Sequence, residues 1–507
     1  MIPAKESLLA KWTEVFSGNG FALKSRPRLR RLAALVIAAS VGVSFSLARA
    51  DDTAPPSAGG TDTAALLDRV RELEAKVDKL EASQKENKAT EDAEIDYIRR
   101  DTEAHSQLFQ PLPPLSSGYD PTTGFVIRSD DGAFSLRPGL VLDIRNDTTY
   151  RENIPKGGGG EVAKIGDDTQ NGFDLTRVRL TLAGNYTQNV DYFLQFQDDQ
   201  GTSFGLLDAY IQYHFGGGSP FSVKVGQFKD PIWHERSLSE ANLLTVDRSL
   251  VEALLGGGET SRVQGAALIY DRDRVRLQGV IHDGYNSLNT KFYDAGGLAG
   301  GVGGGNGVTP TNFGASARGE YLVLGTRSGD LHPFHQYDGG FTALGAQQNI
   351  LVAGVGADYS EAGSNGVLFH TADLQFDTTS GFSAYVAYLG DYRDLHANQG
   401  VAPGNFYDPG FVIQAAYLVT DKLEPFARYD YTYLAGGSEA KSLGVVDHAV
   451  QEITLGANYY LYHQNLKFTL DGTWLPDGAP SDTDALGVLK DSGNNEFVLR
   501  AQCQLAL

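Results

Sequence analysis

The stretch LTRVRLTLAG, residues 175–184, places two arginines in a run that otherwise alternates like a β-strand. Leu180 and Leu182 fall on one parity, whereas Arg177, Arg179 and Thr181 fall on the other. Because successive side chains of a strand point to opposite faces, this strand has one apolar face and one cationic face. We therefore expect the two faces to meet two different environments.

The same alternation continues along the chain from about residue 120. It is clear in FSLRPGLVLDIRN, DYFLQFQ, LLDAYIQYHF, FSVKVGQF, DRVRLQGVIHD and the last stretch, EFVLRAQCQLAL. Further segments lie near 315–323, 350–359, 371–377, 382–390, 411–418, 424–432, 452–460 and 466–474. The pattern predicts about sixteen strands of about 8 to 11 residues, the length that a tilted strand needs to cross a bilayer.

A soluble β-sandwich would also alternate, but other features favour a membrane barrel. Aromatic residues gather at strand ends, as in Tyr459, Tyr460 and Tyr462. Short polar turns alternate with long glycine-rich connectors, as expected for the two sides of a membrane barrel. Lipid offers no hydrogen bonds, so such a sheet must close on itself. We predict an all-β, transmembrane antiparallel barrel whose apolar parity faces lipid and whose arginines stay hydrated in a water-filled lumen.

The N-terminal region predicts export and self-association. A basic segment, an apolar core and Ala48-Arg49-Ala50 resemble a signal peptide over residues 1–50, with a single membrane anchor as the alternative. Residues 51–64 have the composition of a flexible linker. Within 65–110, a 4-3 spacing predicts a short periplasmic coiled-coil helix, the alternative being an amphipathic helix on its own domain; the spaced residues are Leu66, Val70, Leu73, Val77 and Leu80. The barrel would occupy 120–507.

Composition excludes some partners and sites. The net charge of -21 argues against nucleic acid as a partner, because the phosphate backbone would be repelled. A single cysteine excludes an internal disulfide framework and any multi-cysteine metal site. His332, His335 and Asp338 are metal-ligand types, but a solvated loop histidine pair is the simpler interpretation. We expect no cofactor and no metal.

A spaced motif indicates a family. Gly226-Gln227-Phe228-Lys229 is followed by Pro231 and then by DRSL at 247–250, after the strand that carries Arg177 and Arg179. This combination resembles the phosphate-selective porin O and P family of Gram-negative outer membranes, over roughly residues 120–507. The resemblance implies a sixteen-stranded homotrimeric barrel with arginines along the pore wall and lysines near a constriction.

Parity and the motif together give candidate site residues. The polar parity places six cationic side chains on the pore wall: Arg137, Arg177, Arg179, Lys224, Arg276 and Arg500. The long connector after Lys229 is the candidate constriction loop, with Lys229, His234, Glu235, Arg236, Glu240, Asp247 and Arg248 around the narrow part. The alternative role of Lys229 is to anchor the strand end at the lipid headgroups. The alternative role of Arg248 is a structural salt bridge that holds the loop to the barrel wall.

The polar parity carries about as many carboxylates as cations, namely Asp143, Asp208, Asp358, Asp373, Asp377, Asp430 and Asp471. A phosphate filter needs uncompensated donors, so we expect passive diffusion of small hydrophilic solutes, with anions such as phosphate as candidates. One alternative is an outer-membrane anchor whose coiled coil binds a periplasmic cell-wall component. A barrel hydrolase using His214 or His282 is less favoured, and we expect no enzymatic activity.

Overall fold

The computed structural model describes residues 115–120, 124–152, 166–198, 204–255, 261–285, 287–289, 311–327, 332–362, 364–396, 404–435, 448–478, 488 and 495–507, together with residues 68, 71–72 and 74–79. The predicted signal peptide, 1–50, and the linker, 51–64, lie outside the described residues. Of the predicted coiled coil, residues 74–79 are helical and exposed, and Lys76 lies 2.7 Å from Glu72. Pairing of such helices between subunits stays a prediction.

Eighteen strands form the sheet in the described part of the chain. Two of them, β1 and β2, make a separate hairpin that pairs briefly with the barrel. Their bounds and those of the barrel strands are β1 Leu115–Asp120, β2 Gly124–Ser129, β3 Ser135–Arg151, β4 Asp168–Thr187, β5 Val190–Asp198, β6 Phe204–His214, β7 Phe221–Lys229, β8 Arg262–Arg272, β9 Val275–His282, β10 Thr311–Leu324, β11 Ile350–Ala362, β12 Asn365–Asp377, β13 Phe382–Leu395, β14 Gly404–Tyr417, β15 Leu423–Leu434, β16 His448–Tyr462, β17 Leu466–Leu475 and β18 Glu496–Ala506.

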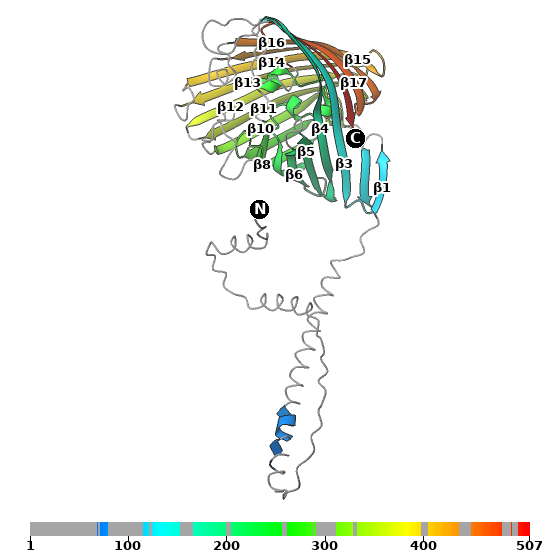
Figure 1. Ribbon diagram of the computed structural model, residues 1–507, viewed down its shortest axis with the longest axis vertical. Coiled ribbons are helices and arrows are strands. Elements are labelled where there is room, and N and C mark those ends of the chain that lie inside the picture. The colour runs from blue at the N-terminus through cyan, green and yellow to red at the C-terminus, as the bar shows by residue number, and fades with distance from the viewer. Residues whose placement is uncertain are drawn as a thin grey trace, which may run out of the picture. The chain divides into compact units, whose positions relative to one another are not determined.

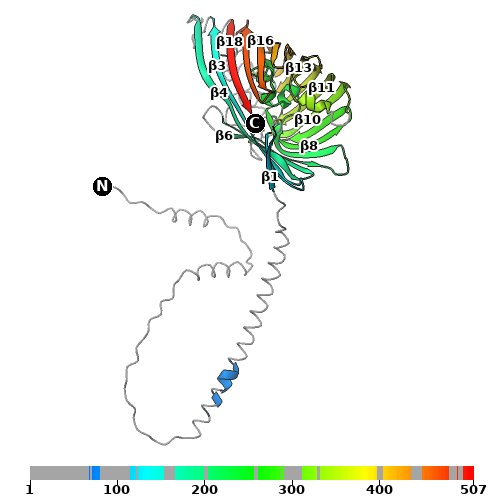
Figure 2. The ribbon, with the colours of Figure 1, turned by 90° about the vertical axis from the view of Figure 1, so that its right-hand side faces the viewer.

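The strands β3 to β18 close into an antiparallel barrel of sixteen strands, which confirms the predicted fold. Each strand pairs with the next along the chain (Figure 1). The last strand, β18, pairs with β3 in register from Glu496 opposite Arg151 to Ala506 opposite Val141. Figure 2 shows red β18 beside β3 at this seam. Closure leaves no barrel strand with an unpaired edge, as a bilayer requires.

The two faces of the wall differ as the alternation predicts. Leu180 and Leu182 of β4 are 45% and 37% exposed on the outside, whereas Arg179 is only 7% exposed on the inside. A bulge at Thr176 explains why Leu175 and Arg177 share a parity but not a face. Asp143 pairs with Arg177 and Ile144 with Leu175, so one extra residue reverses the orientation between them.

Aromatic side chains mark both rims of the outer face. At the short-turn rim, Tyr213 and Phe215 make an edge contact at 5.4 Å between ring centroids. At the long-loop rim, Trp474 and Phe497 stack at 5.9 Å. These side chains are also exposed, as expected of an interfacial girdle.

Two details of the predicted strands were wrong. The strands reach 17 residues in β3 and 20 in β4, longer than the predicted 8 to 11, because paired backbone extends past the apolar zone toward the long loops. The hairpin of β1 and β2 was missed, because LSSGYD and GFVIRS are too short and too polar to show a clear period.

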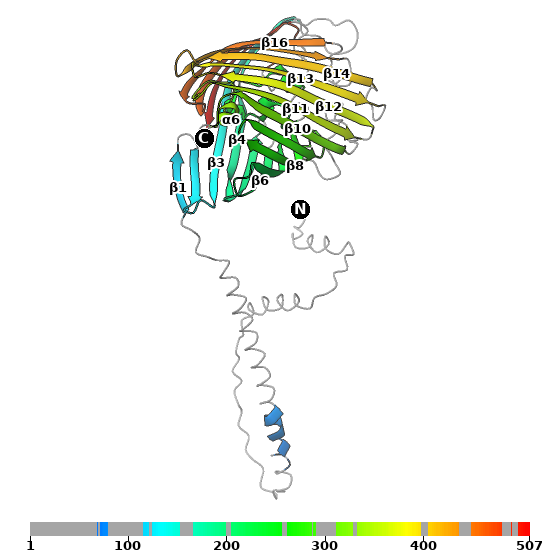
Figure 3. The same cartoon turned by 180° about the vertical axis from the view of Figure 1, so that it is seen from behind.

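The connectors alternate in length between the two rims, with three exceptions. One is the connector 199–203 between β5 and β6, which is short although it lies on the long-loop rim. On the short-turn rim, the connector 325–349 between β10 and β11 is long and contains helix α6, Pro333–Asp338 (Figure 3). On the opposite rim, only residues 363–364 join β11 to β12. Among the described residues, no helix has the length and apolar character of a membrane span.

An arginine on the lipid-facing side should destabilise the barrel. Leu470, near the middle of β17, is 55% exposed on the outer face. We expect Leu470→Arg to lower the free energy of unfolding by about 2–4 kcal/mol, since a cation at the bilayer midplane loses its hydration. Urea unfolding in lipid vesicles measures this, with Leu470→Ala as the control for lost side-chain volume. Equal losses in both variants would mean that Leu470 does not face lipid.

Candidate functional site

Residues 230–255 and 261, the described part of the connector between β7 and β8, fold into the barrel lumen. They contain three short helices, α4 His234–Ser237, η1 Glu240–Asn242 and α5 Leu250–Leu254, visible inside the barrel in Figure 1. Serines begin two of them: the Ser239 side chain accepts from Ala241 N, and the Ser249 side chain accepts from Glu252 N. We call residues 230–255 and 261 the inner loop.

One side of the inner loop packs against apolar residues on the inside of the barrel wall. Its buried apolar side chains form one cluster with residues of β12, β13 and β14; the cluster includes Ile232, Trp233, Leu250, Val251, Phe369, Tyr385 and Val412. Gly356 in β11 permits a close approach, because a Cβ atom there would clash with the carbonyl of Ile232. The lumen beside these strands is therefore filled with protein.

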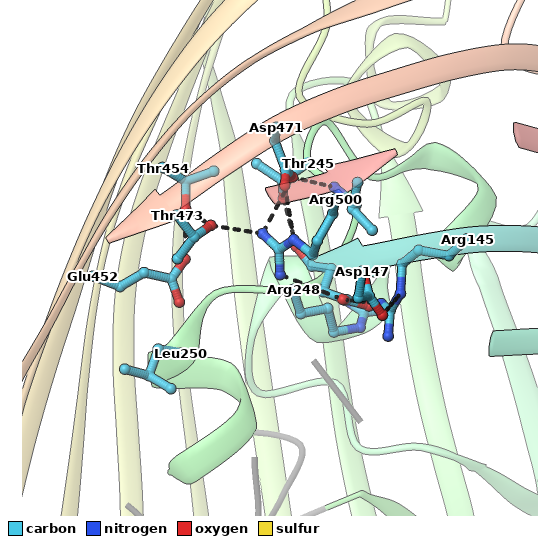
Figure 4. A network of polar contacts seen from close by, with 12 residues as sticks. Arg145, Asp147, Thr245, Arg248, Leu250, Glu452, Thr454, Asp471, Thr473 and Arg500 are labelled. Atoms are coloured by element: carbon cyan, nitrogen blue, oxygen red, sulfur yellow. Dashed lines mark hydrogen bonds and ion pairs between the residues drawn. The ribbon is translucent and has the colours of Figure 1, made fainter. Parts of the chain in front are cut away.

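The carboxylate of Asp247 holds the inner loop to the other side of the wall. It lies 2.5 Å from Arg145 of β3, 2.9 Å from Arg177 of β4 and 3.5 Å from Arg500 of β18. Arg500 also contacts Asp471 at 2.7 Å and donates to Thr473 at 2.8 Å, as the dashed lines in Figure 4 show. One buried loop carboxylate thus joins guanidinium groups on both strands of the closing seam, β3 and β18, and on the neighbouring strand β4.

A second carboxylate, that of Glu240, contacts cationic side chains of both the wall and the loop. Arg179 of β4 donates to it, Arg248 lies 3.1 Å away and Lys229 lies 3.7 Å away. Arg248 also donates to the carbonyls of Glu235 and Leu238, and Lys229 donates to that of Leu238 at 2.5 Å. Both motif cations therefore hold the loop backbone, and Lys229 points inward rather than to lipid headgroups.

The wall also binds backbone groups of the inner loop. Five wall side chains make these contacts: Arg428 to Asp247 O at 2.9 Å, Asp471 to Val246 N at 3.1 Å, Asp430 to Leu250 N at 3.3 Å, Lys467 to Leu243 O at 2.6 Å and Asn458 to Leu244 O at 2.8 Å. Buried backbone groups need partners, so the polar wall supplies what water would otherwise supply.

This arrangement corrects the expectation of hydrated wall arginines. Arg177, Arg179 and Arg500 do face inward, but their side chains are 13%, 8% and 1% exposed and contact loop carboxylates. A guanidinium that is taken from water needs a paired carboxylate and hydrogen bonds, which the inner loop provides. The sequence could not show this, because Asp247 lies far along the chain from all three of its partners.

Three residues of the inner loop, His234, Glu235 and Arg236, were expected to line the narrow part of the pore. In the structure their side chains are buried. The ring of His234 stacks on that of Tyr337 at 3.5 Å between centroids and contacts Gln375 at 3.0 Å. Burial lowers the pKa of His234 to about 4. Glu235 accepts from Ser249 N and Oγ at 2.7 and 2.8 Å, and Arg236 contacts Glu252 at 3.4 Å. Asp247, at 1% exposure, is likewise structural.

The connector 325–349 enters the lumen from the opposite rim and meets the inner loop. Tyr337 accepts from Arg318, and Asp338 binds Arg276 through two hydrogen bonds of 2.7 and 2.8 Å. Gly340, with φ of +107°, lies so close to Asn242 O that a Cβ atom would clash. The sequence predicted that His332 and His335 form a solvated pair in a loop. In the structure their rings stack at 4.0 Å between centroids. No cluster of three metal-ligand residues occurs in the described chain.

A cavity lies between the inner loop and the wall from β3 to β10. This cavity has a volume of about 730 Å³. Three of the six predicted wall cations line it, Arg137, Lys224 and Arg276, together with Lys229 and Glu240 of the loop region. Arg177, Arg179 and Arg500 are not among its lining residues; they form ion pairs with Asp247 and Glu240.

Loss of the Asp247 charge should destabilise the protein strongly. Asp247→Asn leaves Arg145, Arg177 and Arg500 buried without their shared carboxylate. We expect the free energy of unfolding to fall by about 3–5 kcal/mol. Urea unfolding measures the change, with Asp421→Asn in an exposed turn as the matched control. Indistinguishable midpoints for the two variants would contradict the pinning role of Asp247.

The same contact predicts acid sensitivity. Burial raises the pKa of Asp247, but Arg145, Arg177 and Arg500 lower it more, to about 2 from 3.8. Since the folded-state pKa is depressed, the stabilisation is present above about pH 4 and is lost as the pH falls toward 2. The difference in urea midpoint between the parent protein and Asp247→Asn should therefore shrink between pH 5 and pH 2. A difference that stayed constant over this range would exclude the ion pairs as its cause.

Comparisons with solved structures find outer-membrane proteins at low identity. The outer membrane channel DcaP of Acinetobacter baumannii matches with a TM-score of 0.45 and 12% identity, over 75% of this chain and 99% of that chain. OprB of Pseudomonas putida matches with a TM-score of 0.44 and 11% identity, over 74% and 95%. OmpT of Vibrio cholerae matches with a TM-score of 0.43 and 11% identity, over 75% and 99%.

A search of curated protein sequences finds no significant match. The family model described as phosphate-selective porin O and P matches residues 161–475. That range contains the strand with Arg177 and Arg179, the whole inner loop and the connector with α6. The chain therefore belongs to the phosphate-selective porin O and P family.

Proposed function

We propose that this protein is a passive outer-membrane channel for small hydrophilic solutes. Family membership and a closed sixteen-stranded barrel with a polar inner face support this role. The observation that carries the proposal is the cavity of about 730 Å³ that the inner loop leaves on the side next to β3 to β10. Solutes would pass through the cavity of about 730 Å³ on that side.

We propose diffusion rather than a dedicated phosphate filter. Selective anion pores present rings of arginine or lysine whose charge is not compensated. Here Arg276 binds Asp338 and lies beside Glu320, and Arg318 binds Asp373 at 2.9 Å. In the described part of the wall, most arginines are paired in this way. The family description names phosphate, but these pairs favour a less selective channel.

We further propose that three copies assemble and that the N-terminal region serves export and assembly. The homotrimer follows from the family resemblance, the signal peptide from residues 1–50 and the periplasmic coiled coil from the 4-3 spacing in 65–110. Deletion of 61–110 distinguishes assembly from tethering to a cell-wall component. Loss of trimers with intact conductance would support assembly, whereas normal trimers with a detached envelope would support tethering.

Planar bilayer recordings test the channel. We expect stepwise current increments in KCl, with little reduction by millimolar phosphate, because paired arginines offer phosphate few free donors. Protein denatured by boiling before addition serves as the control. Membranes that stay silent with correctly folded protein would refute the channel, and strong block by phosphate would refute its broad selectivity.

A further inference from the structure

The cavity beside the inner loop holds a lysine, Lys224, that forms no ion pair with a carboxylate among the described residues. The four carboxylate side chains that line the cavity each contact an arginine: Asp208 binds Arg262 at 2.9 Å, Glu240 binds Arg179, Glu320 binds Arg276 and Asp338 binds Arg276 at 2.7 Å. Arg137 and Lys224 also line it, and neither forms an ion pair with any residue that the structure describes. The cavity therefore presents two cationic side chains, Arg137 and Lys224, that are not held in ion pairs by its carboxylate side chains.

Lys224 is set in an aromatic wall. Its Nζ atom lies 5.0 Å from the ring centroid of Tyr210 and 4.9 Å from that of Phe228. Phe193 stacks on Tyr210 at 5.2 Å, and Ile269 packs against the cluster around Phe228. Cation–π contacts hold the ammonium group but leave its hydrogen-bond donors unused by carboxylates. A charged group thus projects from an apolar surface.

The ammonium group and the aromatic rings of this surface each favour a different part of a ligand. The ammonium favours an anionic oxygen, and the rings of Phe193 and Tyr210 favour a flat or apolar body. Inorganic phosphate would contact only the ammonium group of Lys224. A neutral sugar would contact only the edges of the aromatic rings. We propose that the wall at Phe193, Tyr210 and Lys224 is a binding subsite for small aromatic carboxylates that pass through the channel.

This inference deepens the proposed function and rests on it, since the subsite would act on solutes in transit. The predicted route passes the subsite, because the inner loop and the connector 325–349 occupy the rest of the lumen near β12 to β14. The carboxylate would contact Lys224 while the ring lies on Phe193 and Tyr210. Arg137, on β3 of the same cavity, would add to the attraction of anions from solution.

The test compares four probes in planar bilayers and by calorimetric titration of the folded protein in detergent. Benzoate carries both the charge and the ring, acetate only the charge, benzyl alcohol only the ring, and phosphate a charge without a ring. We expect benzoate to bind and to reduce the KCl current at concentrations about tenfold or more below those of the other three, since two favourable contacts act together. Equal potency of benzoate and acetate, or stronger block by phosphate, would overturn the subsite.

Single-residue variants show which side chains are responsible for benzoate binding. Lys224→Gln should weaken benzoate binding about tenfold, by loss of the charge-assisted contact. Tyr210→Leu should weaken benzoate more than acetate. Lys422→Gln, in the turn between β14 and β15 and outside this cavity, is the matched control and should bind benzoate like the parent. Gel mobility of the folded barrel checks each variant.

The two readouts separate the subsite from the channel. A protein that conducts KCl but binds benzoate no better than acetate refutes the subsite alone. A protein that stays silent in bilayers but binds benzoate in a Lys224-dependent manner refutes the channel, and with it the role of the subsite in transport, while the binding site itself is supported. Unchanged benzoate binding in folded Lys224→Gln overturns the assignment in either case.

Discussion

The buried carboxylate of Asp247 is the contact on which the rest of the lumen depends. It joins Arg145 of β3, Arg177 of β4 and Arg500 of β18, so one loop residue binds across the seam where the barrel closes. Each guanidinium would be costly to bury alone, and so would the carboxylate. Together they form a group that is satisfied only when the inner loop lies inside the closed barrel. Loop position and barrel closure are therefore coupled.

The coupling makes the lumen asymmetric. Apolar packing fills the space beside β12, β13 and β14, while ion pairs hold the loop to the seam. The connector with α6 reaches the same region from the other rim, where Tyr337 stacks on His234. The open cavity is left beside β3 to β10, where Lys224 is one of two lining cations that form no ion pair with a described residue. Only a small part of the polar wall thus lines this cavity.

The barrel could be predicted from the sequence, because alternation is local and each strand carries its own pattern. Leu180 and Arg179 lie on opposite faces whatever their partners are. The site was harder, because its contacts join residues that are distant in sequence. Nothing near Arg428 or Lys467 indicates that they bind the inner loop, and α6 lies on a rim where short turns were expected. The motif indicated Lys229 and Arg248, but it could not show that both contact Glu240 and the carbonyl of Leu238.

The central claim is that Asp247 keeps the inner loop within the conducting lumen. Single-channel conductance of Asp247→Asn, recorded beside the parent protein and Asp421→Asn in the same membrane, tests it most directly. If the loop is pinned as described, the Asp247 variant will show a larger or strongly fluctuating conductance, while the Asp421 variant matches the parent. A steady conductance identical in all three proteins would contradict the account.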